Sequence, residues 1–162
     1  MNPYRISSVN NDKYVHLKVT DMAQSMGFYV DLLGFKTDRV YEDHTAACLS
    51  TGSHHYLLGL GIWFEQHLPQ SEAQGTSIFH SLIQYPSGKD LAIVYLHLKT
   101  AAYPLIDAVD LGVSEIIYLA DPDGNSLKLC WDRPKKEDSK QPKGVFDRSS
   151  RPLDLGDLLR AL

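Results

Sequence analysis

Two histidines stand at corresponding places in the chain and are the first residues that suggest chemistry. His16 lies in the alternating run 14–19, and His80 lies in the run 78–85, about 64 residues further on. A neutral imidazole is the commonest metal ligand among protein side chains. A single histidine in a strand is more often a packed residue, whereas repetition of its position favours a pair of ligands. Both interpretations stay open at this point.

The first histidine is positioned by a strand followed by a helix. Residues 14–19 alternate between apolar and polar side chains, which predicts a half-buried strand. Thr20 and Asp21 then offer side chains that cap a helix, and apolar residues recur near helical spacing up to Gly34. A glycine in this position favours a left-handed end to the helix.

The same order of elements returns in the second half of the chain. Residues 78–85 predict a strand, Ser87 with Asp90 resembles a capping box, and the next helix should end before Pro104. Short apolar or β-branched runs predict further strands, with a turn at 121–125 before the last. These runs cover residues 45–50, 55–64, 113–119 and 126–131. The sequence therefore predicts an α+β fold of two βαβββ modules.

The domain boundaries follow from changes in composition. We expect one domain over residues 1–134, with a first module at about 11–65 and a second at about 76–134. Residues 65–76 are polar and predict a linker between the modules. Residues 135–162 are expected to form an extension that ends in a short helix, packed on the domain or on a second subunit.

Composition excludes several classes of protein. The 162 residues are 43% hydrophobic, which suffices for one core. The polar first twenty residues and the lack of a long apolar run argue against a signal peptide and a membrane span, so a cytoplasmic location is expected. Cys48 and Cys130 show no CxxC spacing. A net charge of −4, spread along the chain, does not indicate a basic surface that would bind nucleic acid, and it favours a small-molecule partner.

Several motifs in this order resemble the vicinal oxygen chelate superfamily, which includes glyoxalase I, bleomycin resistance proteins and extradiol ring-cleaving dioxygenases. They are VHLKVTD (15–21), FY (28–29), LLGF (32–35), FH (79–80) and YLADPDGN (118–125). GVSE (112–115), WDRP (131–134) and PLDL (152–155) make the likeness strongest to catechol-type dioxygenases. The resemblance implies two modules whose curved sheets form an incomplete barrel around a central cleft.

The resemblance also implies a set of site residues. His16 and His80 match metal ligands, and two histidines with one carboxylate would suit Fe(II). The place of the carboxylate ligand is taken by Lys128. Tyr118, ten residues earlier, matches a tyrosine near the bound substrate and is the expected catalytic residue. Leu111 stands where the related group commonly has a histidine, so one group able to transfer a proton is missing.

Lys128 is the main departure from the dioxygenase pattern. Its ammonium has three donors and no acceptor, and an ordinary pKa of about 10.4 keeps it protonated. At about 4 Å from a dication, with an effective dielectric of about 20, the repulsion would reach roughly 8 kcal/mol before screening. Either the metal site is rebuilt with other ligands, or Lys128 itself takes the place of the cation and binds an anionic ligand.

His55 and Tyr56 bear on the first of these alternatives. They follow Gly52, near the place where glyoxalase-type members contribute a further ligand. We expect them to contact the substrate, and His54 or His55 would complete a three-histidine metal site.

Two functional hypotheses result. The first is a metal-dependent dioxygenase, lyase or isomerase that uses Fe(II) or another divalent metal. The second is a metal-free protein of the bleomycin-resistance type that binds or sequesters a small molecule, with no cofactor because Lys128 blocks the site. A homodimer, formed through a sheet edge or the terminal helix, is an expectation under both.

Overall fold

The first half of the chain forms an open, mixed sheet. The computed structural model describes residues 15–51, 58–62, 81–134 and 150–162. The strand order of the first sheet is β1-β4-β3-β2, with β1 parallel to β4 and the other pairs antiparallel. Its strands are β1 (Val15–Lys18), β2 (Lys36–Val40), β3 (Ala46–Ser50) and β4 (Leu58–Gly61).

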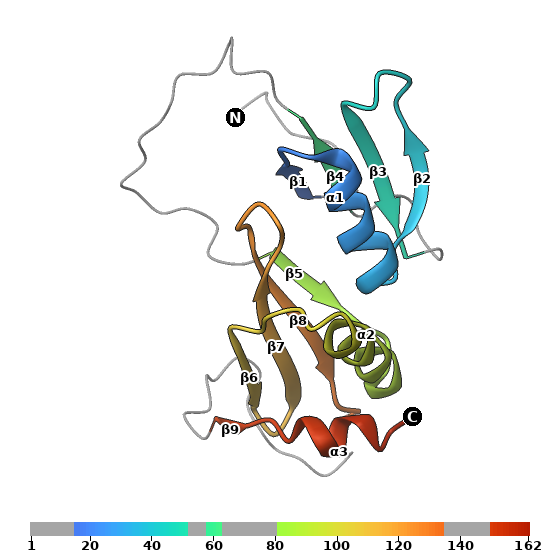
Figure 1. Ribbon diagram of the computed structural model, residues 1–162. Coiled ribbons are helices and arrows are strands. Elements are labelled where there is room, and N and C mark those ends of the chain that lie inside the picture. The colour runs from blue at the N-terminus through green and yellow to red at the C-terminus, as the bar shows by residue number, and fades with distance from the viewer. Residues whose placement is uncertain (1–14, 52–57, 63–80, 135–149) are drawn as a thin grey trace, which may run out of the picture.

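The second sheet repeats this order and adds one strand from the C-terminal segment. Its order is β5-β8-β7-β6-β9, and β5 is again parallel to its neighbour while the other pairs are antiparallel. Its strands are β5 (Ser81–Gln84), β6 (Asp107–Asp110), β7 (Ser114–Ala120), β8 (Ser126–Asp132) and β9 (Arg151–Pro152). Neither sheet is closed, which agrees with an incomplete barrel, and the predicted α+β fold of two repeated modules is confirmed (Figure 1).

Each long helical segment begins at the residue expected from the sequence. The Asp21 side chain caps α1 (Met22–Met26) by accepting from the backbone N–H of Gln24, and α1 continues into the π-helix η1 (Gly27–Leu32). Gly34 then takes the left-handed conformation, with φ of 79°. In the second module, Ser87 caps α2 (Gly88–Thr100), which ends well before the next proline. None of the described helices is long and apolar enough to cross a membrane.

The sequence pattern located only two of the three strands that follow each helix. All five residues of β2 are exposed, so this strand has no apolar alternation that could reveal it. β6 is short and begins with an exposed aspartate, and the two-residue β9 is exposed throughout. Pairing with neighbouring strands, which is a tertiary effect, defines these elements.

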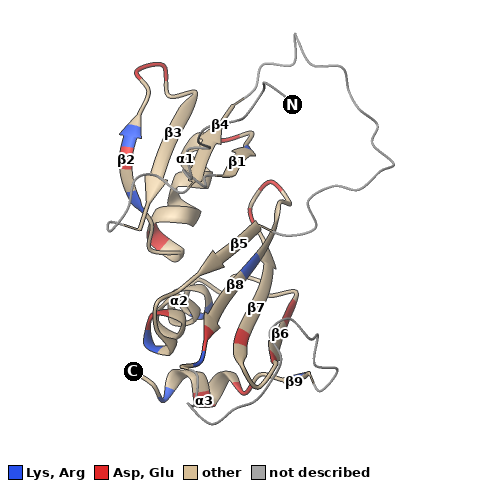
Figure 2. Ribbon diagram, turned by 180° about the vertical axis from the view of Figure 1, so that it is seen from behind, with Lys and Arg blue, Asp and Glu red and all other residues tan. Residues whose placement is uncertain are grey.

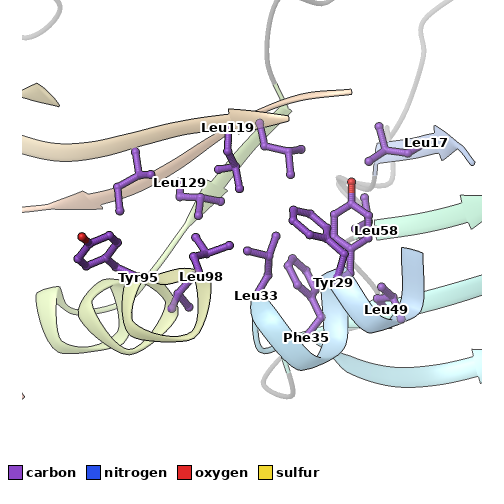
Figure 3. Close-up of a cluster of buried hydrophobic side chains, with 14 of the residues drawn as sticks. Leu17, Tyr29, Leu33, Phe35, Leu49, Leu58, Tyr95, Leu98, Leu119 and Leu129 are labelled. Carbon is purple, nitrogen blue, oxygen red and sulfur yellow. The ribbon is translucent and has the colours of Figure 1, made fainter. Parts of the chain in front are cut away.

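The core lies between the helices and one face of each sheet, and it crosses from one module to the other. Leu33 of the first module and Leu98 and Leu129 of the second belong to the same buried cluster (Figure 3). The Tyr85 hydroxyl donates a hydrogen bond to the Leu33 carbonyl at 3.0 Å. The two modules therefore share one hydrophobic core.

The turn between β7 and β8 fastens the second module to the first. The carboxylate of Asp121, which is 4% exposed, accepts a hydrogen bond from the Tyr29 hydroxyl at 2.7 Å. Asp123 accepts from the backbone N–H and the hydroxyl of Thr20, and the Asn125 amide donates to the Lys18 carbonyl at 3.2 Å. These side chains therefore do more than form the turn that the sequence predicted.

A buried carboxylate also fastens the C-terminal segment to the second sheet. Asp110, 5% exposed, accepts from Arg133, which follows β8, and from Arg151 in β9. The helix α3 (Leu155–Leu159) then packs against α2, with Leu158 buried in the common core. Residues 135–149 lie outside the described part of the chain, and the module and domain boundaries stay predictions.

Replacing Tyr29 with phenylalanine should loosen the attachment between the modules. The change leaves the buried Asp121 carboxylate without one of its donors, which should lower the free energy of unfolding by about 1–3 kcal/mol. Urea denaturation measures the loss. Tyr41→Phe is the matched control because Tyr41 is 47% exposed, and an equal loss in both variants would contradict the proposed fastening.

Asp110 should make the stability of the protein depend on pH in the acid range. Its hydrogen bonds with Arg133, opposed in part by burial, hold its pKa well below the ordinary value. The carboxylate therefore stabilises the fold above pH about 4, and this contribution is lost as the pH falls further. Asp110→Asn should be less stable at pH 7 by about 1–3 kcal/mol and should lose less stability than the wild type on acidification, as followed by thermal unfolding at several pH values. Parallel pH profiles would show that the pairing is unimportant.

Candidate functional site

Tyr118 and Lys128 lie side by side on the second sheet. The antiparallel register of β7 and β8 places them directly opposite each other, and Leu82 of β5 is the neighbour of Lys128 on its other side. The buried Leu127 and Leu129 point toward α2, so the residues between them point to the other face. Lys128 is the only basic residue of β8, a strand that carries a blue segment in Figure 2. The structure thus brings two of the expected site residues together on the face away from the helix.

A polar cluster lies further along the same face. Asp132 accepts hydrogen bonds from the Ser114 hydroxyl at 2.6 Å and from the Gln84 amide at 2.9 Å. The Cys130 thiol lies 3.5 Å from the same carboxylate. Burial and the charge of Asp132 raise the pKa of Cys130 to about 11, although the charge of Lys128 acts in the opposite direction. The thiol stays protonated near neutral pH, which does not suit a nucleophile.

His16 lies on the corresponding face of the first sheet, where a glycine makes room for its ring. It pairs with Gly59 of β4, and a Cβ atom built on Gly59 would stand 2.7 Å from both Cδ2 and Nε2 of the imidazole. That distance is well inside van der Waals contact, so the ring occupies the space that a side chain at residue 59 would need. Gly59 therefore helps to set the orientation of His16.

One described residue, Lys128, does not suit the metal site that the resemblance implies. No group of three or more His, Cys, Asp or Glu side chains that could hold a metal ion occurs among them. His16 is the one implied ligand that the described ranges contain. Lys128, which cannot coordinate while protonated, stands where the resemblance implies the third ligand. His80, His55 and Tyr56 lie outside the described residues, so their roles stay predictions.

Comparison with known proteins identifies the family. A family model described as the Glyoxalase/Bleomycin resistance protein/Dioxygenase superfamily matches residues 13–129. The chain belongs to this superfamily. Among solved structures of the family, a glyoxalase/dioxygenase from Nostoc punctiforme has a TM-score of 0.61 at 17% identity, covering 81% of this chain and 97% of that one. A lactoylglutathione lyase from Agrobacterium tumefaciens has a TM-score of 0.56 at 14% identity, covering 77% and 93% respectively. These likenesses concern the fold.

Two curated members of the superfamily show similarity in sequence. Catechol-2,3-dioxygenase of Bacillus subtilis is 29% identical over 62% of this chain and 36% of its own length. Biphenyl-2,3-diol 1,2-dioxygenase 3 of Rhodococcus globerulus is 28% identical over 72% of this chain and 60% of its own length. The chain therefore spans roughly one third to three fifths of these relatives. The family model over residues 13–129 establishes superfamily membership.

Sequence reasoning missed the cluster around Asp132 and the role of Gly59. Once Lys128 is placed in a strand, alternation puts residues 130 and 132 on its face, so part of the cluster was accessible from the sequence. The contribution of Ser114 and Gln84 depends on the register with β7 and β5, which the sequence does not specify. The contact of His16 with Gly59 likewise depends on the pairing of β1 with β4.

A double-mutant cycle tests whether Gly59 keeps space for His16. Gly59→Ala should move the imidazole, which changes its NMR signals, and should destabilise the protein despite the higher strand propensity of alanine. In a His16→Ala background, Gly59→Ala should not lower the free energy of unfolding. We expect a coupling of about 1 kcal/mol between the two positions, measured by urea unfolding of the four proteins. Additive effects would show that the ring does not occupy this space.

Proposed function

We propose that the protein binds a small anionic molecule on the face of the second sheet that carries Tyr118 and Lys128, and that it does so without a metal. The observation that carries this proposal is the pairing of Lys128 with Tyr118 across β7 and β8. A fixed positive charge and a hydroxyl stand together where the family resemblance leads one to expect a carboxylate ligand. A cation in that position favours an anion directly, with no dication between them.

Lys128 has no acidic partner in the part of the chain that the structure describes. Lys128 takes part in none of the ion pairs found among the described residues. Asp107 is aligned with Tyr118 on the other side, but its carboxylate accepts the backbone N–H of Ala108 at 2.8 Å. Asp132 is four residues away along β8, about 13 Å in an extended strand. The ammonium is therefore available to a ligand.

The neighbours of Lys128 favour an aromatic acid or a phenol that ionises. Leu82 is 58% exposed beside it, and the Tyr118 ring adds aromatic surface. The names of the two curated relatives refer to catechol and biphenyl-diol, which are phenols. A flat ligand could place its ring against these side chains and its negative oxygen near the ammonium. Binding or sequestration of such a compound is the activity that this arrangement supports best.

A metal-dependent enzyme is the second candidate. It is favoured by the space that Gly59 provides for His16 and by the dioxygenase names of the curated relatives. Such an enzyme would hold Fe(II) or another divalent metal with His16, His80 and a further histidine from residues 54–55. This histidine would replace the carboxylate ligand that the resemblance implies at position 128. The expected homodimer also remains a prediction.

Binding of 4-nitrocatechol, a coloured phenol that ionises near neutral pH, tests the metal-free proposal. In chelator-treated protein, the bound dye should show the absorption of its anion, and affinity should fall as the pH drops below the pKa of the dye. Lys128→Met should weaken binding about tenfold, and Tyr118→Phe should weaken it less.

Lys36→Met is the control for this experiment, because Lys36 is an exposed lysine of the first sheet. Its affinity for the dye should equal that of the wild type. Loss of binding in both lysine variants, or in neither, would mean that Lys128 does not anchor the anion.

A further inference from the structure

A second hollow lies on the opposite, helix-covered side of the second sheet. It has a volume of about 610 Å³ and is lined by residues of the first turn of α2, the end of β8, and the segment from β9 to α3. Trp131 forms part of its wall, and a Cβ atom on Gly88 would stand 3.0 Å from the indole ring. Leu153 and Leu158 add apolar surface. Trp131 lies three residues after Lys128 in β8, so the two side chains point to opposite faces of the sheet. The sheet therefore separates this hollow from the face that carries Tyr118 and Lys128.

The two acids deepest in the hollow already have cationic partners. Asp110 accepts from Arg133 and Arg151, and Glu115 is paired with Arg133. Arg133 also donates to the Gly112 carbonyl, so both of its terminal nitrogens are committed. These acids are neutralised and their lone pairs are largely occupied.

The two acids at the rim are committed as well. Asp154 caps α3 by accepting from the backbone N–H groups of Gly156 and Asp157. The Asp157 carboxylate pairs with Arg160. Among the described residues, each acid that lines the hollow accepts at least one hydrogen bond or ion pair.

Two cationic groups at the hollow retain free donors. Lys89 is exposed in the first turn of α2 and makes no hydrogen bond or ion pair with any residue that the structure describes. Arg151 bonds Asp110 through Nε and Nη2 only, and its side chain is 73% exposed. The hollow therefore offers hydrogen-bond donors from two cationic side chains next to an indole ring and two leucines.

We propose that this hollow is a second binding site, for a small molecule with one acid group, a carboxylate or a phosphate ester, attached to an aromatic or aliphatic body. The acid group accepts from Lys89 and from the outer nitrogen of Arg151, and the N-terminal end of α2 adds to the favourable potential. The body packs against Trp131 and Leu153. Because the C-terminal segment supplies one wall, the site exists only when that segment is attached to the second sheet.

NMR titration of the full chain with benzoate, phenyl phosphate and neutral benzyl alcohol tests this proposal. Both acids should shift the Trp131 indole N–H signal, and benzyl alcohol should shift it at much higher concentration only. Lys89→Gln should weaken the binding of the acids about threefold to fivefold, as expected for an exposed charged contact. The tighter of the two acids identifies the ligand class as carboxylate or phosphate.

Two control variants show whether the Trp131 response arises at this hollow. Lys99→Gln changes an exposed lysine in the last turn of the same helix, and Lys128→Met removes the cation of the opposite face. Neither should alter the Trp131 response, whatever becomes of dye binding at Lys128. The proposal fails if the acids do not shift the Trp131 signal, if benzyl alcohol binds as well as benzoate, or if Lys89→Gln has no effect. Inorganic phosphate that binds as tightly as phenyl phosphate would overturn the role of the apolar wall.

Discussion

The buried carboxylate of Asp121 is the interaction on which the arrangement of the two modules depends. It lies in the turn between β7 and β8, is almost inaccessible to solvent, and accepts a hydrogen bond from the hydroxyl of Tyr29 in the first module. Burial, together with this carboxylate, raises the pKa of Tyr29 far above its ordinary range, so the phenol stays a donor. The same turn leads into the two strands that carry Tyr118 and Lys128. The same turn therefore attaches the second module to the first and joins the two strands that carry the candidate site.

The identity of residue 128 then decides what chemistry the face that carries Tyr118 and Lys128 supports. A carboxylate there would complement two histidines in binding a dication, whereas an ammonium repels a dication and attracts an anion. Residue 128 is paired on both sides through its backbone, and those hydrogen bonds do not depend on the charge of its side chain. A superfamily fold can thus be retained while one substitution reverses the charge that the site presents.

The repeated strand-helix order was predictable because periodicity, helix caps and turn residues act locally. Asp21, Ser87 and Gly34 have the conformations that their types favour, and the strand pattern around Leu17 follows from burial on one face. β2 was not located because its side chains are all exposed, and the environment of His16 depends on a glycine 43 positions away. The site was predictable to the extent that Tyr118 and Lys128 were both proposed. Their direct opposition, and the hydrogen bonds of Asp132, come from the register between strands.

Anaerobic titration with Fe(II), followed by desalting and elemental analysis, tests the central claim most directly. We expect the wild-type protein to retain almost no iron, because Lys128 stands where the family resemblance implies a carboxylate ligand. Lys128→Glu restores the carboxylate and should retain close to one equivalent, lost again when His16 is also replaced by alanine. About one equivalent of iron in the wild type, dependent on His16, would contradict the metal-free proposal and favour the enzyme.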